Sequence, residues 1–347
     1  MIQKVILDMD NALTIPAQDT DDALALALAL VSPELDVLGC TTCAGNCRTP
    51  QSTLNTLRLL EAGGIRAVPV AEGHPTALAR DREPHFRYLM SKTNGPERRF
   101  WENLPEPSAP QLAADALPAS EFIVQTVRRH PGEVIFVALG ALTNLALALL
   151  EDPDMAGLLK GVVHMGGSFD PADGAPFVWQ TPDIPDDVWR TTLRFNTVFD
   201  PEAAAVVFRA GIPVTLVPAN VTTRVFQRPH HLEQLHAGGT NWHRYLATYA
   251  RPWVEWSIHE RQLPGAHMHD PLTVAVVIDA TFCRIESMDL SVPALLTGKG
   301  PWLSRDAGGL PVKAAADVDA ARFETWLADR LSAPVLARYL SPAGPPA

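Results

Sequence analysis

The sequence predicts an α/β fold built on an open, largely parallel but mixed sheet that is flanked by helices. Segments rich in Val and Ile alternate with segments rich in Ala and Leu along most of the 347 residues. The expected strands are almost continuously apolar, which is typical of parallel strands covered by helices on both faces. Hydrophobic residues make up 47% of the chain, so a sizeable core can form. Because no repeat or clear boundary divides the sequence, we expect one domain over residues 1–347.

Eight segments are expected to be strands because they are short, apolar and mostly rich in β-branched residues. They cover residues 4–10, 36–42, 67–73, 133–140, 161–167, 212–220, 287–296 and 310–318. Two other segments, residues 80–117 and 169–189, lack clear periodicity. Loops of this length in a compact domain often cover a binding site, although they can also be plain surface excursions.

Seven segments are expected to be helices, and the first of them is ambiguous by pattern. They cover residues 21–32, 50–64, 121–132, 143–153, 200–211, 269–279 and 319–331. The first alternates Leu and Ala with period two, as a strand would, but Ala and Leu are strong helix formers. Two aspartates at its start favour a helix N-terminus, and its apolar character all round predicts burial. Proline starts the second helix and glycines end it.

Composition and charge restrict the class of protein. The formal net charge is -11, which disfavours binding to nucleic acid or to an anionic membrane surface. The first residues become charged too early for a secretory signal, and the longest apolar run is too short to span a bilayer. We therefore expect a cytoplasmic protein. Cys40, Cys43 and Cys47 lack a fourth ligand at zinc-finger spacing, so we expect small buried thiols rather than a zinc site.

A dense group of carboxylates follows the first expected strand. The stretch LDMDNALTIPAQDTDD runs from Leu7 to Asp22 and contains five aspartates. Like charges this close repel one another, and a buried carboxylate without a partner is costly. The stretch is therefore either a solvated loop or a segment whose carboxylates gather around a cation.

Polar residues and glycines follow nearly every expected strand. Since ligands bind beyond the carboxyl ends of strands in open α/β sheets, one shared site is plausible. Asp10, Asp22 and Asp270, together with a backbone carbonyl, would make an all-oxygen cage that suits Ca²⁺ or Mg²⁺ rather than zinc. Taken singly, each of these residues could instead cap a helix or complete a turn.

The opening stretch resembles the first motif of the haloacid-dehalogenase-like phosphatases. In that motif the first Asp is a nucleophile and the second is a general acid/base. The fold would also need a later lysine and a later acidic pair at strand ends. Lys160 and Asp186–Asp187 are the candidates that the sequence offers.

A broader resemblance spans about residues 2 to 330. The chain resembles the inosine–uridine-type nucleoside hydrolases, which cleave N-ribosidic bonds with a tightly held Ca²⁺. The matches, in family order, are Asp-x-Asp at 8–10, Asp-Asp-Ala at 21–23, Gly-Asn at 45–46, GALTN at 140–144, HMGG at 164–167, RFNTVFDPEAA at 194–204, HDP at 269–271 and TGK at 297–299. Ordered matches over the whole chain are more specific than any one of them.

The resemblance implies an N-glycosyl hydrolase and a role for each matching residue. Asp10, Asp22 and Asp270 would bind Ca²⁺ with the carbonyl of Thr143, and Asp10 would be the general base for a calcium-held water. His269 would act near the leaving base. The expected substrate-binding residues are Asp21, Asn46 and Asn196 at the ribose hydroxyls, with Met165, Arg194, Trp253 and Arg261. The partner would be a small nucleoside-like molecule, and the protein a homodimer or homotetramer.

Three departures from the family pattern concern the first turn and the 5′ side of the sugar. The first turn is longer, adding Asn11 to Thr20. Arg194 replaces a glutamate that would meet the 5′ end of ribose, and the preceding Asn has no match between Pro185 and Leu193. Arginine donates in a fork suited to phosphate or carboxylate, so a substrate with an anionic 5′ group is one hypothesis. Pairing of Arg194 with a local acid is the other. A phosphatase and a non-catalytic riboside-binding protein are the alternatives to the hydrolase.

Overall fold

The core of the fold is an eight-stranded sheet in the order β3-β2-β1-β4-β5-β6-β10-β9. The structure, a computed structural model, describes residues 2–169, 195–291 and 309–340. The strands are β1 (Gln3–Met9), β2 (Leu35–Thr42), β3 (Val70–Glu72), β4 (Val134–Ala138), β5 (Gly161–Met165), β6 (Val214–Val217), β9 (Cys283–Leu290) and β10 (Leu310–Val318). All neighbours pair in parallel except β9, which runs antiparallel to β10 at the edge. The predicted open, largely parallel but mixed sheet is confirmed.

The strand order reverses between β1 and β4. From β1 the chain proceeds through β2 to β3 on one side, and from β4 it proceeds through β5 to β6 on the other. Connections that diverge from two adjacent parallel strands leave a crevice beyond their carboxyl ends, where ligands of α/β proteins bind. The aspartates after β1 and the GALTN segment after β4 both lie at this crevice.

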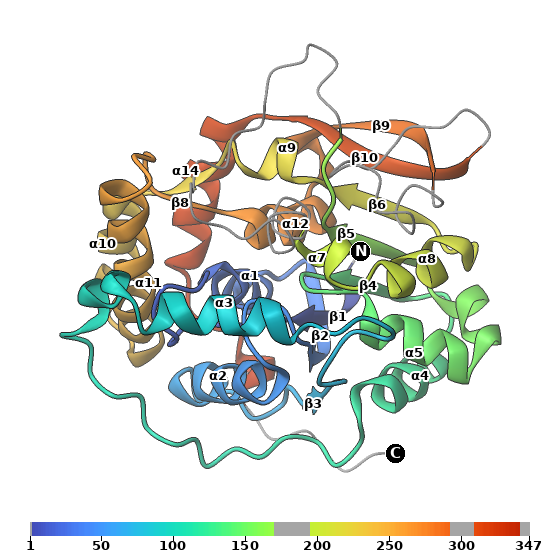
Figure 1. Ribbon diagram of the computed structural model, residues 1–347, viewed down its shortest axis with the longest axis horizontal. Coiled ribbons are helices and arrows are strands. Elements are labelled where there is room, and N and C mark those ends of the chain that lie inside the picture. Colours follow the sequence, from blue (N-terminus) through green and yellow to red (C-terminus); the bar gives the residue numbers. More distant parts are fainter. Residues whose placement is uncertain (1, 170–194, 292–308, 341–347) are drawn as a thin grey trace.

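Helices cover both faces of the sheet (Figure 1). They are α1 (Asp21–Val31), α2 (Thr49–Ala62), α3 (Glu83–Thr93), α4 (Ala119–Arg129), α5 (Thr143–Glu151), α7 (Phe195–Phe199), α8 (Pro201–Arg209), α9 (Ala219–Thr222), α10 (Pro229–Ala237), α11 (Asn241–His259), α12 (His269–Ile278) and α14 (Ala320–Leu331). Side chains of β1 alternate between two core clusters, as the two-residue period of a strand requires. Val5, Leu7 and Met9 join α1, α12 and α14, whereas Ile6 joins α4, α5 and α8.

The helix whose pattern was ambiguous is confirmed. α1 is buried along all of its 11 residues, including the two aspartates that begin it. It packs against α12, which is also mostly buried. Two buried helices that both begin at the carboxyl edge of the sheet bring their acidic first turns together, and this packing builds the site described below.

Several elements were not predicted. The segment 80–117 contains α3 and a 3₁₀ helix at Pro96–Trp101, so its first half is ordered structure rather than an irregular loop. α10, α11 and a short hairpin of β7 (Phe226–Gln227) with β8 (Ala266–His267) fill the stretch before α12. The expected strand at 287–296 corresponds to β9, which begins earlier, at Cys283, and ends at Leu290, whereas residues 292–296 lie outside the described residues. Among the described residues, no helix has both the length and the apolar character needed to cross a membrane.

Candidate active site

The carboxylate of Asp10 is held by the loop that follows the neighbouring strand. Asp10 comes directly after β1, and its Oδ2 accepts a hydrogen bond of 2.7 Å from the backbone N–H of Asn46, which follows β2. Gly45 permits this approach, because a Cβ at that position would lie 1.8 Å from Oδ2 of Asp10. The structure thus brings Asp10 and Asn46 into contact. The residue before Asn46 must be glycine because any side chain there would clash with Asp10.

Three further aspartates converge beside Asp10. One carboxylate oxygen each of Asp21, Asp22 and Asp270 lies within 4.8 Å of the others, and all three residues are buried. Asp10 is not part of this 4.8 Å group, but its backbone N–H donates a 3.1 Å hydrogen bond to Oδ1 of Asp22. The N–H of Asp270 donates to Oδ2 of Asp21 over 2.9 Å, which joins the N-termini of α1 and α12.

Burial makes the charged forms of these carboxylates unfavourable. Desolvation, reinforced by nearby carboxylates, raises the pKa of Asp10 to about 7. The same two causes raise the pKa values of Asp21, Asp22 and Asp270 well above the ordinary range for aspartate. Oδ2 of Asp22 is buried and has no hydrogen-bond partner among the described residues. A cation among the carboxylates would remove both the repulsion and this unsatisfied acceptor.

The donor set suits a hard divalent cation. Carboxylate and carbonyl oxygens are the ligands that Ca²⁺ and Mg²⁺ take in proteins. Cys40, Cys43 and Cys47 are buried free thiols, and burial raises their pKa values, so they are neutral and poor metal ligands. Within the part of the chain that the structure describes, the three aspartates form the only group of three or more potential metal ligands. The group fits an oxygen-preferring metal rather than zinc.

Asp8 has a structural role. It is fully buried, and its Oδ1 accepts hydrogen bonds from Thr41 Oγ1 over 2.6 Å and from Asn144 Nδ2 over 2.8 Å. Asn144 also donates to the carbonyl of Thr42, so it links β1, β2 and the start of α5. These two hydrogen bonds make the Asp8 carboxylate a link between β1, β2 and α5. The phosphatase role that the opening motif suggested for Asp8 therefore has no structural support.

The residues after β4 and β5 hold the short helix α7. Nδ2 of Asn196, in α7, donates to the carbonyls of Leu139 and Met165, the second over 3.0 Å. The structure therefore brings Met165 and Asn196 into contact beside the end of β4. Thr143 is the first residue of α5, and its Oγ1 donates over 2.7 Å to Oδ2 of Asp200, a fully buried carboxylate.

His269 and Arg261 lie at another side of the site. His269 precedes Asp270, and its Nδ1 shares a 2.6 Å hydrogen bond with Oγ1 of Thr222. Burial, with a further contribution from the charge of Arg261, lowers the pKa of His269 to about 3, so the imidazole is neutral. Arg261 itself lies 5.5 Å from the ring centroid of Trp256 and interacts electrostatically with Asp19. Burial lowers its pKa to about 10, which leaves it protonated at neutral pH.

The remaining predicted site residues are placed less directly. Trp253 is buried in the core beside α1 and stacks on the half-buried Trp256, with ring centroids 4.6 Å apart. Arg194 and the Thr-Gly-Lys match at 297–299 lie outside the described residues. Burial raises the pKa of Asp19, which interacts electrostatically with Arg261 and with the other aspartates. Asp19 lies in the added turn Asn11 to Thr20, so the family pattern did not predict that it would lie near the site.

Comparison with known proteins identifies the family of the chain. The family model of the inosine-uridine preferring nucleoside hydrolases matches residues 5–325. Uridine nucleosidase 1 of Arabidopsis thaliana is 31% identical over 332 residues, which are 91% of this chain and 89% of that protein. The pyrimidine-specific ribonucleoside hydrolase RihA of Citrobacter koseri is 35% identical over 258 residues, which are 74% of this chain and 75% of that protein.

Solved structures give the same result. A plant nucleoside hydrolase, the PpNRh1 enzyme, superposes with a TM-score of 0.75 at 27% identity and covers 96% of this chain and 100% of its own. A purine-preferring ribonucleoside hydrolase of Gardnerella vaginalis also gives 0.75, at 25% identity, over 95% and 98% of the two chains. The protein is an N-glycosyl hydrolase that cleaves the N-glycosidic bond of a nucleoside, and nothing favours a phosphatase or a binding-only protein. The chain belongs to the inosine-uridine preferring nucleoside hydrolase family.

Proposed function

We propose that the protein hydrolyses a ribonucleoside, with uridine as the first candidate, by means of a calcium ion held at the aspartate cluster. The observation that carries the proposal is the buried convergence of Asp21, Asp22 and Asp270 within 4.8 Å, beside Asp10. The uridine candidate comes from the Arabidopsis relative, which is a uridine nucleosidase. A homodimer or homotetramer and a cytoplasmic location are further proposals, which rest on the family resemblance and on the sequence.

In this proposal Asp10, Asp22 and Asp270 hold the ion, together with the carbonyl of Thr143. A bound Ca²⁺ would grip the 2′- and 3′-hydroxyls of the sugar and orient a water molecule for attack on C1′. Asp21, which begins α1 next to Asp22, would accept a hydrogen bond from a sugar hydroxyl. Asn46, Asn196 and Met165 would complete the sugar side. The donor hydrogens of Asn196 already reach Leu139 and Met165, so Oδ1 is the atom that it offers to a hydroxyl.

Asp10 would be the general base. Its carboxylate is oriented by the N–H of Asn46 at 2.7 Å, which fixes the direction in which it can accept a proton from water. The C1′–N bond breaks as the water oxygen bonds to C1′, and the sugar develops positive charge in an oxocarbenium-like transition state. The surrounding carboxylates stabilise that charge.

His269 and Arg261 would act on the departing base. Because the pKa of His269 is about 3, the ring is neutral and cannot act as an imidazolium acid. Its Nδ1 lies against Oγ1 of Thr222, and the other ring nitrogen would donate a hydrogen bond to the base. Arg261 stays protonated and would offset negative charge that builds up on the base. Trp253 and the neighbouring Trp256 would supply an aromatic side to the base pocket.

A hydrolysis panel tests the proposal. Uridine, cytidine, inosine and adenosine are incubated with the calcium-loaded protein, and free base and ribose are measured by chromatography. Equal amounts of base and ribose from at least one nucleoside are expected. A simple phosphomonoester, offered in parallel with Mg²⁺, should release no phosphate. Phosphate release without any base release would overturn the proposal.

A further inference from the structure

The short helix α7 carries Asn196 but has few means of its own to stay in place. It spans only Phe195–Phe199, and an isolated helix of this length is unstable in water. Its last carbonyl groups have no partner within the helix. Near its start, Asn196 reaches the carbonyls of Leu139 and Met165, and Oγ1 of Thr197 shares a 3.0 Å hydrogen bond with His164. The C-terminal end needs a separate support.

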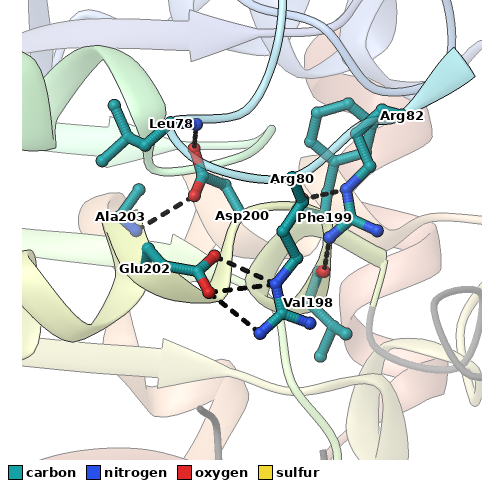
Figure 2. Close-up of polar contacts among 8 residues, drawn as sticks. All are labelled: Leu78, Arg80, Arg82, Val198, Phe199, Asp200, Glu202 and Ala203. Atoms are coloured by element: carbon teal, nitrogen blue, oxygen red, sulfur yellow. Dashed lines mark hydrogen bonds and ion pairs between the residues drawn. The ribbon is translucent and has the colours of Figure 1, made fainter.

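Arg82 supplies that support (Figure 2). Its Nε donates to the carbonyl of Phe199 and its Nη2 to the carbonyl of Val198, both over 2.6 Å. Arg82 is only 9% exposed, and its guanidinium lies 5.3 Å from the ring centroid of Phe199. A cation at the C-terminal end of a helix also interacts favourably with the helix dipole. Arg82 therefore supplies both the hydrogen-bond donors and the positive charge that stabilise the C-terminal end of α7.

The chain around Arg82 is fixed to the same region by two other contacts. The backbone N–H of Leu78 donates over 2.8 Å to Oδ2 of Asp200, the carboxylate that also accepts from Ala203 at the start of α8 (Figure 2). Arg80 forms a two-pronged ion pair with Glu202, with Nη2 and Oε1 2.9 Å apart. That pair is about one-third exposed and reaches α8, whereas Arg82 reaches α7.

We propose that Arg82 is a positioning residue for sugar binding, because it fixes the helix that carries Asn196. This inference rests on the proposed role of Asn196 at the ribose. Arg82 holds two main-chain carbonyls in a fork that only a guanidinium can fill from one position. Without it, α7 would fray from its C-terminal end, and the amide of Asn196 would spend less time in the orientation that the sugar requires.

The test compares Arg82→Met with Arg80→Met, which removes a neighbouring arginine tied to α8. Steady-state kinetics use whichever nucleoside among uridine, cytidine, inosine and adenosine the wild type cleaves best. We expect Arg82→Met to raise KM about tenfold with kcat changed less than about threefold, since sugar binding in the ground state is weakened. Arg80→Met should leave both constants near the wild-type values. Arg82→Lys, which keeps the charge but loses the fork, should lie between and serves if the Met variant folds poorly.

Hydrogen exchange supplies a readout that does not depend on turnover. Amides of α7 should exchange faster in Arg82→Met than in Arg80→Met, while those of the first turn of α8, capped by Asp200, should not. Equal KM values in the two arginine variants, or a raised KM without faster exchange in α7, would overturn the inference. Asn196→Ala distinguishes failure of the inference about Arg82 from failure of the proposed role of Asn196. An unchanged KM in that variant would overturn the role of Asn196 itself.

Discussion

The backbone N–H of Asp10 and Oδ1 of Asp22 are joined by a hydrogen bond of 3.1 Å, although a long turn separates the two residues in the chain. The added residues Asn11 to Thr20 do not push the two aspartates apart, because most of them pack against α2 and α3. Thr14 donates to Asn55 of α2 over 2.5 Å, and Gln18 is buried against α3. Most of the lengthened turn thus lies against α2 and α3, and Asp19 near its end faces the aspartate cluster.

Asp10→Asn should abolish most turnover while leaving the fold intact. The amide keeps the shape of the carboxylate but cannot take a proton from water, so we expect kcat to fall by about 10²- to 10⁴-fold. Asp154→Asn, at an exposed position in the 3₁₀ helix after α5, is the matched control and should behave as the wild type. Retention of more than about one-tenth of kcat in Asp10→Asn would remove it from the role of base.

Calcium affinity should depend on pH in a direction set by the raised carboxylate pKa values. In the metal-free protein the pKa of Asp10 is about 7, so this group is largely protonated below that pH. Calcium must displace the proton, so affinity should rise as the pH rises toward about 7. Calorimetry in two buffers of different ionisation enthalpy measures the protons released. Affinity that falls as pH rises from about 5 to about 7 would contradict the assignment.

His269→Ala and Arg261→Met should act on the leaving group. We expect kcat on uridine to fall by about 10²-fold in each variant, because the base then departs without a hydrogen bond or a nearby positive charge. A p-nitrophenyl riboside releases a stable phenolate that needs neither, so its turnover should change by less than about threefold. If both substrates lose activity equally, the two residues act on the sugar or on the fold instead.

One hypothesis from the sequence is that Arg194 binds an anionic group at the 5′ position of the substrate. The ratio of kcat/KM for uridine 5′-phosphate to that for uridine is measured in the wild type and in Arg194→Glu. A guanidinium donates to phosphate and a glutamate repels it, so the wild type should favour the phosphate and the variant should reverse the preference. The same ratio in both proteins would show that Arg194 turns to a local acid.

Much of the fold follows from local pattern, and the missed elements have physical reasons. β1, α5 and α12 were predicted because their apolar runs are long and buried. α11 was missed because its buried face mixes Trp, Tyr and His with Leu, Ala and Val, and because Pro252, an ordinary helix breaker, lies inside it. α3 was missed because it has few apolar residues, and only His85, Phe86 and Thr93 of it are buried.

The candidate site was predictable in part. The sequence places Asp10, Asp22 and Asp270 at element ends that share one edge of the sheet, and topology brings them near one another. It does not fix which oxygens come closest, and the 4.8 Å group contains Asp21 in place of Asp10. The hydrogen bonds from Arg82 to Phe199 and from Leu78 to Asp200 join residues more than 100 positions apart in the chain, and no local pattern signals them.

The most direct test of the account is ribose release by metal-stripped protein as Ca²⁺ is added in known equivalents. We predict almost no release from uridine, or from the best nucleoside of the panel, before calcium is added, because no ion orients the water and the sugar. Release should then rise in proportion and reach its plateau at about one equivalent per chain, as one cluster of this kind requires. Asp22→Asn, which loses a ligand, should need far more calcium to reach any plateau. Full ribose release by the stripped protein in the presence of a chelator would contradict the account.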